Sequence, residues 1–303
     1  MLYDSFDRRI TYLRISVTDK CNLRCVYCMP PGGVPKRSHA DMLSHEQVRD
    51  IVRVGCSLGI EKIRLTGGEP LVKKGIVELV GLLRQVDPLL TIGMTTNGTL
   101  LAPLARDLKA AGLSSVNVSL DTLDPEEYRR ITRGGDVGKV LGGIDAARKA
   151  GFPVKINAVV PEAAGGETAP GVPEDLKRFC EESGLTLQLI NHFSLSVEKR
   201  DSSEVLGGAG EEAASAGGRD KSGARPDLAV GKPGPEILRR PPSCSRCNRL
   251  RLLARGVLKP CLHSDLEIPV DFSDIEGSLR KAAGAKPERG SACMGREMVE
   301  IGS

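Results

Sequence analysis

Short apolar runs alternate with amphipathic stretches from the N-terminus to about residue 190. The runs are rich in β-branched residues and too short for helices, so they predict strands. The clearest helical stretch is Ser44–Gly59, where Ser44 and Gln47 can form a capping box and Gly59 can end the helix. The predicted strands are Leu13–Val17, Lys62–Leu65, Thr91–Thr95, Ser115–Leu120, Val154–Val160 and Leu185–Ile190.

Strands and helices that alternate in series predict a parallel sheet with helices packed outside it. Right-handed crossovers can curve six such strands into a partial barrel, whose active site lies at the C-terminal ends of the strands. We therefore expect an α/β fold, a partial (β/α)6 TIM-like barrel. The other predicted helices are Ile76–Gln85, Pro103–Ala111, Val137–Ala150, Pro173–Glu182 and Asp274–Ala283.

Residues 202–235 differ from the rest of the chain, because they are rich in glycine and contain no Phe, Tyr, Ile or Met. Such a composition buries too little apolar surface to offset the conformational entropy of the chain. We therefore expect three regions: a barrel at 1–198, a flexible linker at 199–242 and a C-terminal segment at 243–303.

Composition excludes several classes of protein. Hydrophobic residues make up 40% and charged residues 27% of the chain, as in ordinary globular proteins. A net charge of +4 gives no strongly basic surface, so no nucleic-acid partner is expected. No apolar run has the length of a membrane span, and the N-terminus has no apolar secretory signal. The expected location is the cytoplasm, without a membrane partner.

Six of the nine cysteines form two groups of three, which in a reducing compartment indicates metal rather than disulfides. The first group, Cys21, Cys25 and Cys28, has the spacing C-x3-C-x2-C directly after the first predicted strand. Three thiolates on one loop can hold three irons of a cubane cluster and leave the fourth iron open. The alternative is a structural zinc knuckle, which needs a fourth ligand nearby.

The second group, Cys244, Cys247 and Cys261, again offers three thiolates. From these residues alone, a second cluster and a zinc site with His263 as fourth ligand are equally reasonable. Arg249 and Arg251 lie two residues apart, so they share one face of an extended segment. Paired guanidinium groups suit a polyanionic ligand such as a nucleoside triphosphate, although two solvated arginines are the simpler alternative.

The first cysteine group, with Tyr27 before its third cysteine, resembles the signature of the radical S-adenosylmethionine (SAM) superfamily. The segment Gly67-Gly68-Glu69-Pro70 resembles the GGEP motif of that superfamily, with two glycines that let backbone approach a ligand and Glu69 beside the SAM amino group. With the second group, the chain resembles the GTP 3′,8-cyclase family over about residues 14–190 and 243–303.

This resemblance implies roles for individual residues. Two [4Fe-4S] clusters are expected, one for SAM and one in the C-terminal segment for the substrate. Polar residues on or near strands one to five can converge on one cavity. The implied cluster ligands are Cys21, Cys25, Cys28, Cys244, Cys247 and Cys261; the implied SAM contacts are Tyr27, Gly68, Ser119 and Phe193; the implied GTP contacts are Arg14, Arg64, Thr95, Lys155, Arg249 and Arg251, the last two also catalytic.

The resemblance also implies the reaction. A 5′-deoxyadenosyl radical takes hydrogen from the ribose C3′ of GTP, and the ribose radical attacks C8 of guanine. The product is (8S)-3′,8-cyclo-7,8-dihydroguanosine 5′-triphosphate, in the first step of molybdenum cofactor biosynthesis. Implied partners are an electron donor such as ferredoxin or flavodoxin and the downstream cyclic pyranopterin monophosphate synthase, with a monomer or homodimer as the functional form.

The sequence departs from the family pattern on the substrate side. The family's sixth strand carries Arg, Glu and Met, but this chain has Gln188, Asn191 and Phe193 there, and it ends in Gly302-Ser303 instead of Gly-Gly. Two alternatives therefore stay open. One is a two-cluster paralogue that acts on another substrate such as a peptide, which gives no reason for Arg249 and Arg251. The other is a non-catalytic iron–sulfur or zinc protein.

Overall fold

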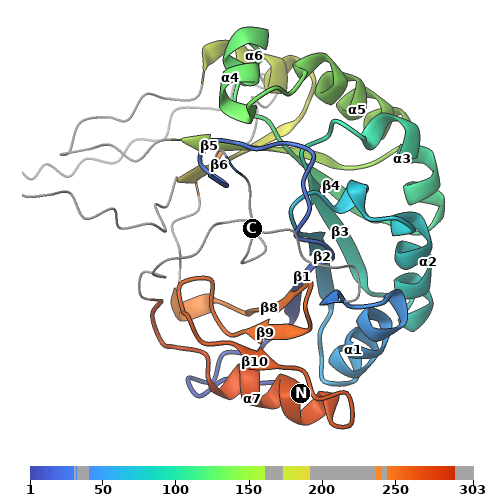
Figure 1. Ribbon diagram of the computed structural model, residues 1–303, viewed down its shortest axis with the longest axis vertical. Helices are drawn as coiled ribbons and strands as arrows, with labels where there is room; N and C mark the ends of the chain where they lie inside the picture. Colours follow the sequence, from blue (N-terminus) through green and yellow to red (C-terminus); the bar gives the residue numbers. More distant parts are fainter. Residues whose placement is uncertain (31, 33–40, 161–172, 192–236, 240–243, 291–303) are drawn as a thin grey trace, which may run out of the picture.

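The computed structural model describes residues 1–30, 32, 41–160, 173–191, 237–239 and 244–290. Within these ranges the strands form one ten-stranded sheet in the order β10-β9-β8-β1-β2-β3-β4-β5-β6-β7. Figure 1 shows the sheet curving as an arc, with α1 to α6 on its outer side. The sheet is an open, partial barrel in the part of the chain that the structure describes, as the pattern predicts.

All six predicted strands form, and they pair in parallel in sequence order. Their observed bounds differ from the predicted ones by one residue at most. The strands are β1 (Tyr12–Ser16), β2 (Lys62–Thr66), β3 (Thr91–Thr96), β4 (Ser115–Ser119), β5 (Val154–Val160) and β6 (Thr186–Asn191).

The predicted helices also form. The first has the expected capping box, in which Ser44 accepts a hydrogen bond from the Gln47 backbone and the Gln47 side chain accepts one from the Ser44 backbone. The helices are α1 (His45–Ser57), α2 (Ile76–Val86), α3 (Leu101–Ala110), α5 (Val137–Lys149), α6 (Glu174–Glu182) and α7 (Ile275–Gly284).

One helix was not predicted, α4 (Pro125–Thr132). It is short and polar, and among its residues only Tyr128 and Thr132 are buried, so it has almost no apolar repeat. Its start is nevertheless encoded, because the Asp124 side chain caps the helix and Pro125 occupies its first turn, where the missing N–H costs nothing.

The C-terminal part extends the same sheet. β8 (Arg249–Leu253) pairs in parallel with β1, and β9 (Val257–Lys259) and β10 (Ile268–Pro269) continue the sheet beyond it. At the other edge, β7 (Ile237–Arg239) pairs with β6, so the end of the expected linker forms a strand. The rest of that linker lies outside the described residues.

Most side chains on the central strands alternate between two environments. One set is fully buried and apolar, as Leu13, Ile15, Ile63 and Leu65 show. The other set is polar and includes Arg14 and its neighbours in the register. Because side-chain direction has a period of two, the polar residues of β1 to β6 and β8 share one face of the sheet. Among the described helices, none is long and apolar enough to cross a membrane.

Candidate active site

The first cysteine group lies on a turn that follows the C-terminal end of β1. Cys28 N donates to Cys25 O at 2.9 Å, and Leu23 N donates to Cys21 Sγ at 3.4 Å. The loop is also fixed from outside, since Arg24 N and Val26 N donate to backbone carbonyls at the end of α4. The unpredicted helix α4 therefore supports the cluster loop.

The GGEP loop packs backbone to backbone against the segment before Cys21. Gly68 N donates to Thr18 O, and Glu69 N donates to Lys20 O, both at 2.8 Å. A Cβ added at Gly67 would lie 2.3 Å from Thr18 O, and one at Gly68 would lie 2.4 Å from Lys20 O. The close approach that requires glycine here is thus to the cluster loop, whereas the sequence analysis assigned it to a ligand.

The Glu69 side chain joins the GGEP loop to the end of β3. It is buried, and its carboxylate accepts hydrogen bonds from Thr96 Oγ1 at 2.7 Å, Asn97 N at 2.7 Å and Leu71 N at 3.0 Å. Burial raises the pKa of Glu69 to about 7, although the three hydrogen bonds lower it. We therefore assign Glu69 to holding the loops together.

Asn97 connects this junction to the first cysteine group. Its Nδ2 atom lies 3.9 Å from Cys21 Sγ and donates to Asn22 Oδ1 at 2.9 Å. Glu69 and Asn97 therefore link the C-terminal ends of β1, β2 and β3 around Cys21. Asn97 was not singled out from the sequence, although it stands in the Thr-Thr-Asn-Gly stretch at a strand end, where functional groups gather.

Tyr27 makes a second link across the site. Its hydroxyl donates to Asp121 Oδ2 at 2.7 Å, and Asp121 Oδ1 accepts from Val159 N at 2.8 Å. Burial raises the pKa of Asp121 and, with the Asp121 charge, raises that of Tyr27 well above its usual value. Tyr27 therefore stays protonated and holds the cluster loop to the ends of β4 and β5.

The first cysteine group fits an iron–sulfur cluster by its donor set. Burial raises the pKa of the Cys21 thiol, and burial together with Cys21 and Asp121 raises that of Cys25 to about 12. Thiolates in this position are costly without a cation, and a bound iron centre removes that cost by binding them deprotonated. All three cysteines are partly buried, and none forms a disulfide within the described residues, as an enclosed cluster requires.

Three arginines form a row across adjacent strands. Arg14 on β1 is paired in register with Arg64 on β2 and with Arg251 on β8. Gly93 on β3 makes room for the Arg64 guanidinium, since a Cβ there would lie 2.8 Å from one of its nitrogens. Arg64 donates to Tyr12 Oη at 3.1 Å and to Met94 O at 3.0 Å.

Like charges that lie side by side and out of water are unfavourable unless an anion joins them. Burial lowers the pKa of Arg14, and burial followed by the charges of Arg14 and Arg249 lowers that of Arg251 to about 9. Arg14 Nε is buried without a hydrogen-bond partner among the described residues. The row of Arg14, Arg64 and Arg251 thus has the properties of a binding site for a polyanion.

The remaining predicted contacts lie farther along the same polar face. Thr95 on β3 and Lys155 on β5 are both in register with Asn117 on β4, so they form a second row. Ser119 closes β4 at its C-terminal end, next to Asn157. The chain thus brings the predicted GTP contacts and Ser119 to one face of the sheet, whereas Tyr27 and Gly68 lie on the loops after β1 and β2. Phe193 lies outside the described residues together with Gly302 and Ser303.

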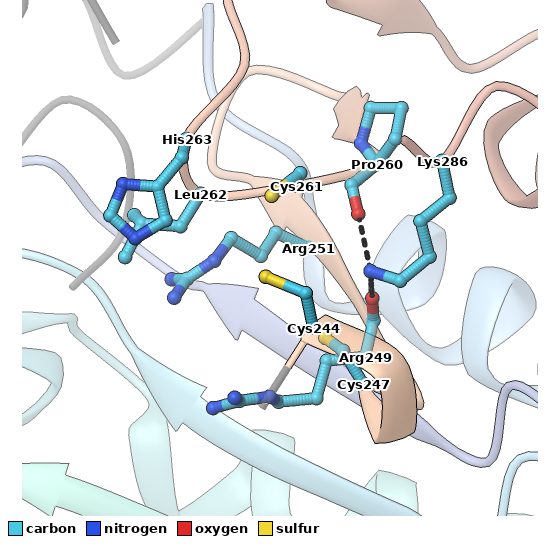
Figure 2. Close-up of a pocket in the computed structure, with 9 residues that line it drawn as sticks. All are labelled: Cys244, Cys247, Arg249, Arg251, Pro260, Cys261, Leu262, His263 and Lys286. Atoms are coloured by element: carbon cyan, nitrogen blue, oxygen red, sulfur yellow. Dashed lines mark hydrogen bonds between the residues drawn. The ribbon is translucent and has the colours of Figure 1, made fainter. Parts of the chain in front are cut away.

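Figure 2 shows the second cysteine group around a pocket of about 90 Å³. Cys244, Cys247 and Cys261 line it together with Arg249 and Arg251. His263 lies at the same pocket, and its pKa is lowered by burial and by Arg251. The three sulfur atoms border a cavity, which is the arrangement that suits a cluster with its own volume.

The pocket also contains Lys286, a residue that no motif of the sequence indicates. Although burial opposes the shift, the charges of Lys286 and Arg249 leave the pKa of the Cys247 thiol below its usual value. Lys286 comes from a turn after α7 and has no local pattern that could have revealed it. The alternation of polar residues could have revealed Tyr12 and Lys62, which share the face of Arg14 and Arg64.

The two cysteine groups lie at opposite ends of the same pair of strands. Cys21 follows the C-terminal end of β1, whereas Cys247 precedes Arg249, which pairs with Tyr12 at the N-terminal end of β1. The arginine row lies between these ends. A ligand that spans the polar face can therefore face both groups at once.

Comparisons with known proteins agree with this arrangement. The pattern of the radical SAM superfamily matches residues 15–163. The GTP 3′,8-cyclase of Peptoclostridium acidaminophilum is 44% identical over 296 residues, which cover 93% of this chain and 87% of the relative. The GTP 3′,8-cyclase of Geobacter sulfurreducens is 41% identical over 316 residues, which cover 96% and 95%.

Among solved structures, Streptococcus suis SuiB bound to the precursor peptide SuiA superposes with a TM-score of 0.52 at 18% identity. The match covers 62% of this chain and 40% of SuiB, and at this identity it shows the shared fold alone. The cysteine loop, the GGEP junction and the long matches to its relatives place the chain in the GTP 3′,8-cyclase family of the radical SAM superfamily.

Proposed function

We propose that the protein converts GTP to (8S)-3′,8-cyclo-7,8-dihydroguanosine 5′-triphosphate, the first step of molybdenum cofactor biosynthesis. One observation carries the proposal: Arg14, Arg64 and Arg251 form a row between two cysteine groups at opposite ends of the strands. A substrate held by this row faces a SAM site at one end and a second cluster at the other.

The SAM site is proposed at the C-terminal ends of β1 to β4. Cys21, Cys25 and Cys28 would hold a [4Fe-4S] cluster, which supplies the electron that cleaves SAM to methionine and a 5′-deoxyadenosyl radical. We assign Gly68 on the GGEP loop and Ser119 at the C-terminal end of β4 to SAM contacts. Tyr27 acts through Asp121 to fix the loop that carries the cysteines.

The arginine row would bind the triphosphate. Guanidinium groups donate paired hydrogen bonds to phosphate oxygens, and the buried Arg14 Nε supplies a donor without a partner among the described residues. Thr95 and Lys155 extend the polar face toward the SAM site. We expect GTP held in this way to direct its ribose toward the SAM site, and such positioning lowers the barrier to hydrogen transfer.

The second group, Cys244, Cys247 and Cys261, would hold a second [4Fe-4S] cluster. Because three cysteines would bind three of its irons, the cluster would keep one iron without a protein ligand, and that iron would offer a binding site for the guanine base. Arg249 and Arg251 stand directly beside this pocket, so triphosphate and base are fixed from the same strand.

The decisive experiment is an anaerobic assay of the reconstituted, reduced protein with SAM. We expect 5′-deoxyadenosine to form in a GTP-dependent manner, together with an equal amount of cyclised nucleotide. SAM cleavage that is indifferent to GTP would contradict GTP as substrate and favour a paralogue with another substrate.

Replacing Cys25 with Ala tests the non-catalytic alternative. We expect this variant to lose SAM cleavage while the second cluster persists, because Cys25 belongs to the first group alone. Metal analysis of the same sample distinguishes iron from zinc at the second group, since about four irons and no zinc should remain.

A further inference from the structure

Lys286 enters the second cysteine pocket from the turn after α7, and its side chain is 3% exposed. Its Nζ atom donates to Arg249 O at 2.8 Å and to Pro260 O at 2.9 Å, as Figure 2 shows. These two carbonyls lie in different segments of the chain: Arg249 is the first residue of β8, and Pro260 directly follows β9.

The two acceptors flank cluster ligands. Arg249 lies two residues after Cys247, and Pro260 directly precedes Cys261. The β8–β9 ladder ends at the pair Arg251 and Lys259, and the Lys286 ammonium group joins the two segments just beyond it. It therefore holds together the segments that carry Cys247 and Cys261.

The segment from Lys286 to Gly290 packs around the same group. The Arg8 guanidinium donates to Cys244 O at 2.6 Å, to Pro287 O at 2.7 Å and to Glu288 O at 3.0 Å. A Cβ at Gly290 would lie 3.1 Å from Cys261 Sγ, so the backbone there approaches the sulfur closely. All three cysteines are thus held by this segment or by groups bound to it.

The charge of Lys286 has a direct target. A buried cation is costly unless an anion or several hydrogen bonds stabilise it. Two backbone carbonyls satisfy two of its three protons, and Lys286 lines the same pocket as Cys247. Hydrogen bonds and positive charge near cluster thiolates favour the reduced cluster.

We propose that Lys286 is a positioning residue for the second iron–sulfur cluster, which holds Cys247 and Cys261 at cluster spacing and raises the reduction potential of the cluster. The inference rests on the proposed function in one respect, because it takes the second group to bind a cluster. It concerns Lys286, to which the proposed function assigns no contact with GTP or SAM.

The test uses the full chain with Cys21, Cys25 and Cys28 replaced by Ala, so that only the second cluster reports. In this parent we compare Lys286→Met, Lys286→Gln and Lys286→Arg. The matched control is Lys281→Met, which removes an exposed lysine of α7. Iron and sulfide are counted after anaerobic gel filtration, and the midpoint potential is measured by titration followed by electron paramagnetic resonance.

We expect Lys286→Met and Lys286→Gln to weaken cluster binding about tenfold or more and to move the midpoint to a more negative potential. Lys286→Arg should restore most of the potential, because it keeps the charge, and Lys281→Met should match the parent. A purely structural lysine would lower iron retention alone, so an unchanged midpoint in the neutral variants overturns the proposal. A parent that binds no iron would instead overturn the second cluster itself, which distinguishes the two failures.

Discussion

Arg14 on β1 and Arg251 on β8 are direct partners in the register of two parallel strands, although they come from opposite ends of the chain. Neighbouring strands lie about 4.8 Å apart, so the two side chains start close together and project from the same face. Burial lowers the pKa of both arginines, and the Arg14 charge further lowers the pKa of Arg251. The fold therefore maintains a repulsive pair of cations, which a bound polyanion would relieve.

Replacing Arg251 with Met should stabilise the protein in the absence of nucleotide. Replacing a buried charge by an apolar side chain of similar size is often stabilising, by about 1–4 kcal/mol. At 1 kcal/mol this corresponds to a rise of about 2 °C or more in the apparent melting temperature of the reconstituted protein. The same variant should lose GTP-dependent product.

The pH dependence of this effect has a defined sign. The folded pKa of Arg251 is lowered to about 9, so above this pH the unfolded chain binds more protons than the folded one. The cost of burying the protonated Arg251 is fully present well below pH 9. The free energy of unfolding therefore increases as pH rises through about 9. The advantage of Arg251→Met should consequently shrink between about pH 8 and pH 10. An advantage that stays constant would mean that Arg251 keeps its proton in the folded protein over this pH range.

Arg14→Gln should weaken GTP binding without preventing cluster assembly. The variant removes charged donors from the centre of the row, and hydrogen bonds to a charged group contribute about 1.5–3 kcal/mol, or about tenfold to a hundredfold in affinity. Calorimetric titration with GTP under anaerobic conditions measures the loss. The matched control is Arg53→Gln, since Arg53 is an exposed arginine of α1; equal affinities of the two variants would remove Arg14 from the site.

The sequence predicts the six central strands well because each combines a fully buried apolar set with an alternating polar set. Leu13, Ile15, Ile63 and Leu65 are all 0% exposed, so a slip of one residue would bury Arg14 or Arg64 in the helix-covered core. At these positions the alternation in the sequence matches the burial of the side chains in the fold. The bounds of the strands can therefore be predicted from the sequence.

Other parts of the site depend on contacts that local patterns do not encode. The pairing of β8 with β1 joins distant segments, so only the structure puts Arg251 beside Arg14. Helix α4 was missed because its stability comes from the Asp124 cap and from Tyr128 rather than from an apolar repeat. The role of Lys286 depends on two backbone carbonyls, which carry no sequence signal at all.

Gly68→Ala should selectively damage the first cluster. The added Cβ would lie 2.4 Å from Lys20 O and 2.8 Å from Asp19 O, and these backbone atoms cannot move without displacing Cys21. We expect total iron to fall by about half, because the second cluster is retained. The control is Gly142→Ala in α5, where nothing lies within 4 Å and a helical alanine stabilises by about 0.5–1 kcal/mol. An unchanged iron content in Gly68→Ala would contradict the close backbone contact between Gly68 and Lys20.

Glu69→Gln tests the junction between the GGEP loop and β3. Both carboxylate oxygens of Glu69 accept hydrogen bonds, and the Gln amide would set an N–H group against the backbone N–H of Asn97 or Leu71. Leaving such buried groups unpaired costs about 1–3 kcal/mol, so the variant should melt at a lower temperature than the natural protein. SAM binding should weaken as well, because the loops that Glu69 joins surround the proposed SAM site.

The size of this difference should depend on pH. Burial raises the folded pKa of Glu69 to about 7, above its unfolded value, so the folded protein binds more protons between the two values. The contribution of Glu69 to stability is thus fully present below the unfolded pKa and is lost as pH rises through about 7. The difference in melting temperature between the natural protein and Glu69→Gln should therefore narrow from about pH 5 to pH 8. The control is Glu126→Gln, an exposed site on α4, whose melting temperature should change with pH in the same way as that of the natural protein. A gap of constant size would show that Glu69 keeps its charge in the folded protein, and the loops would then be joined by an ionised carboxylate at every pH tested.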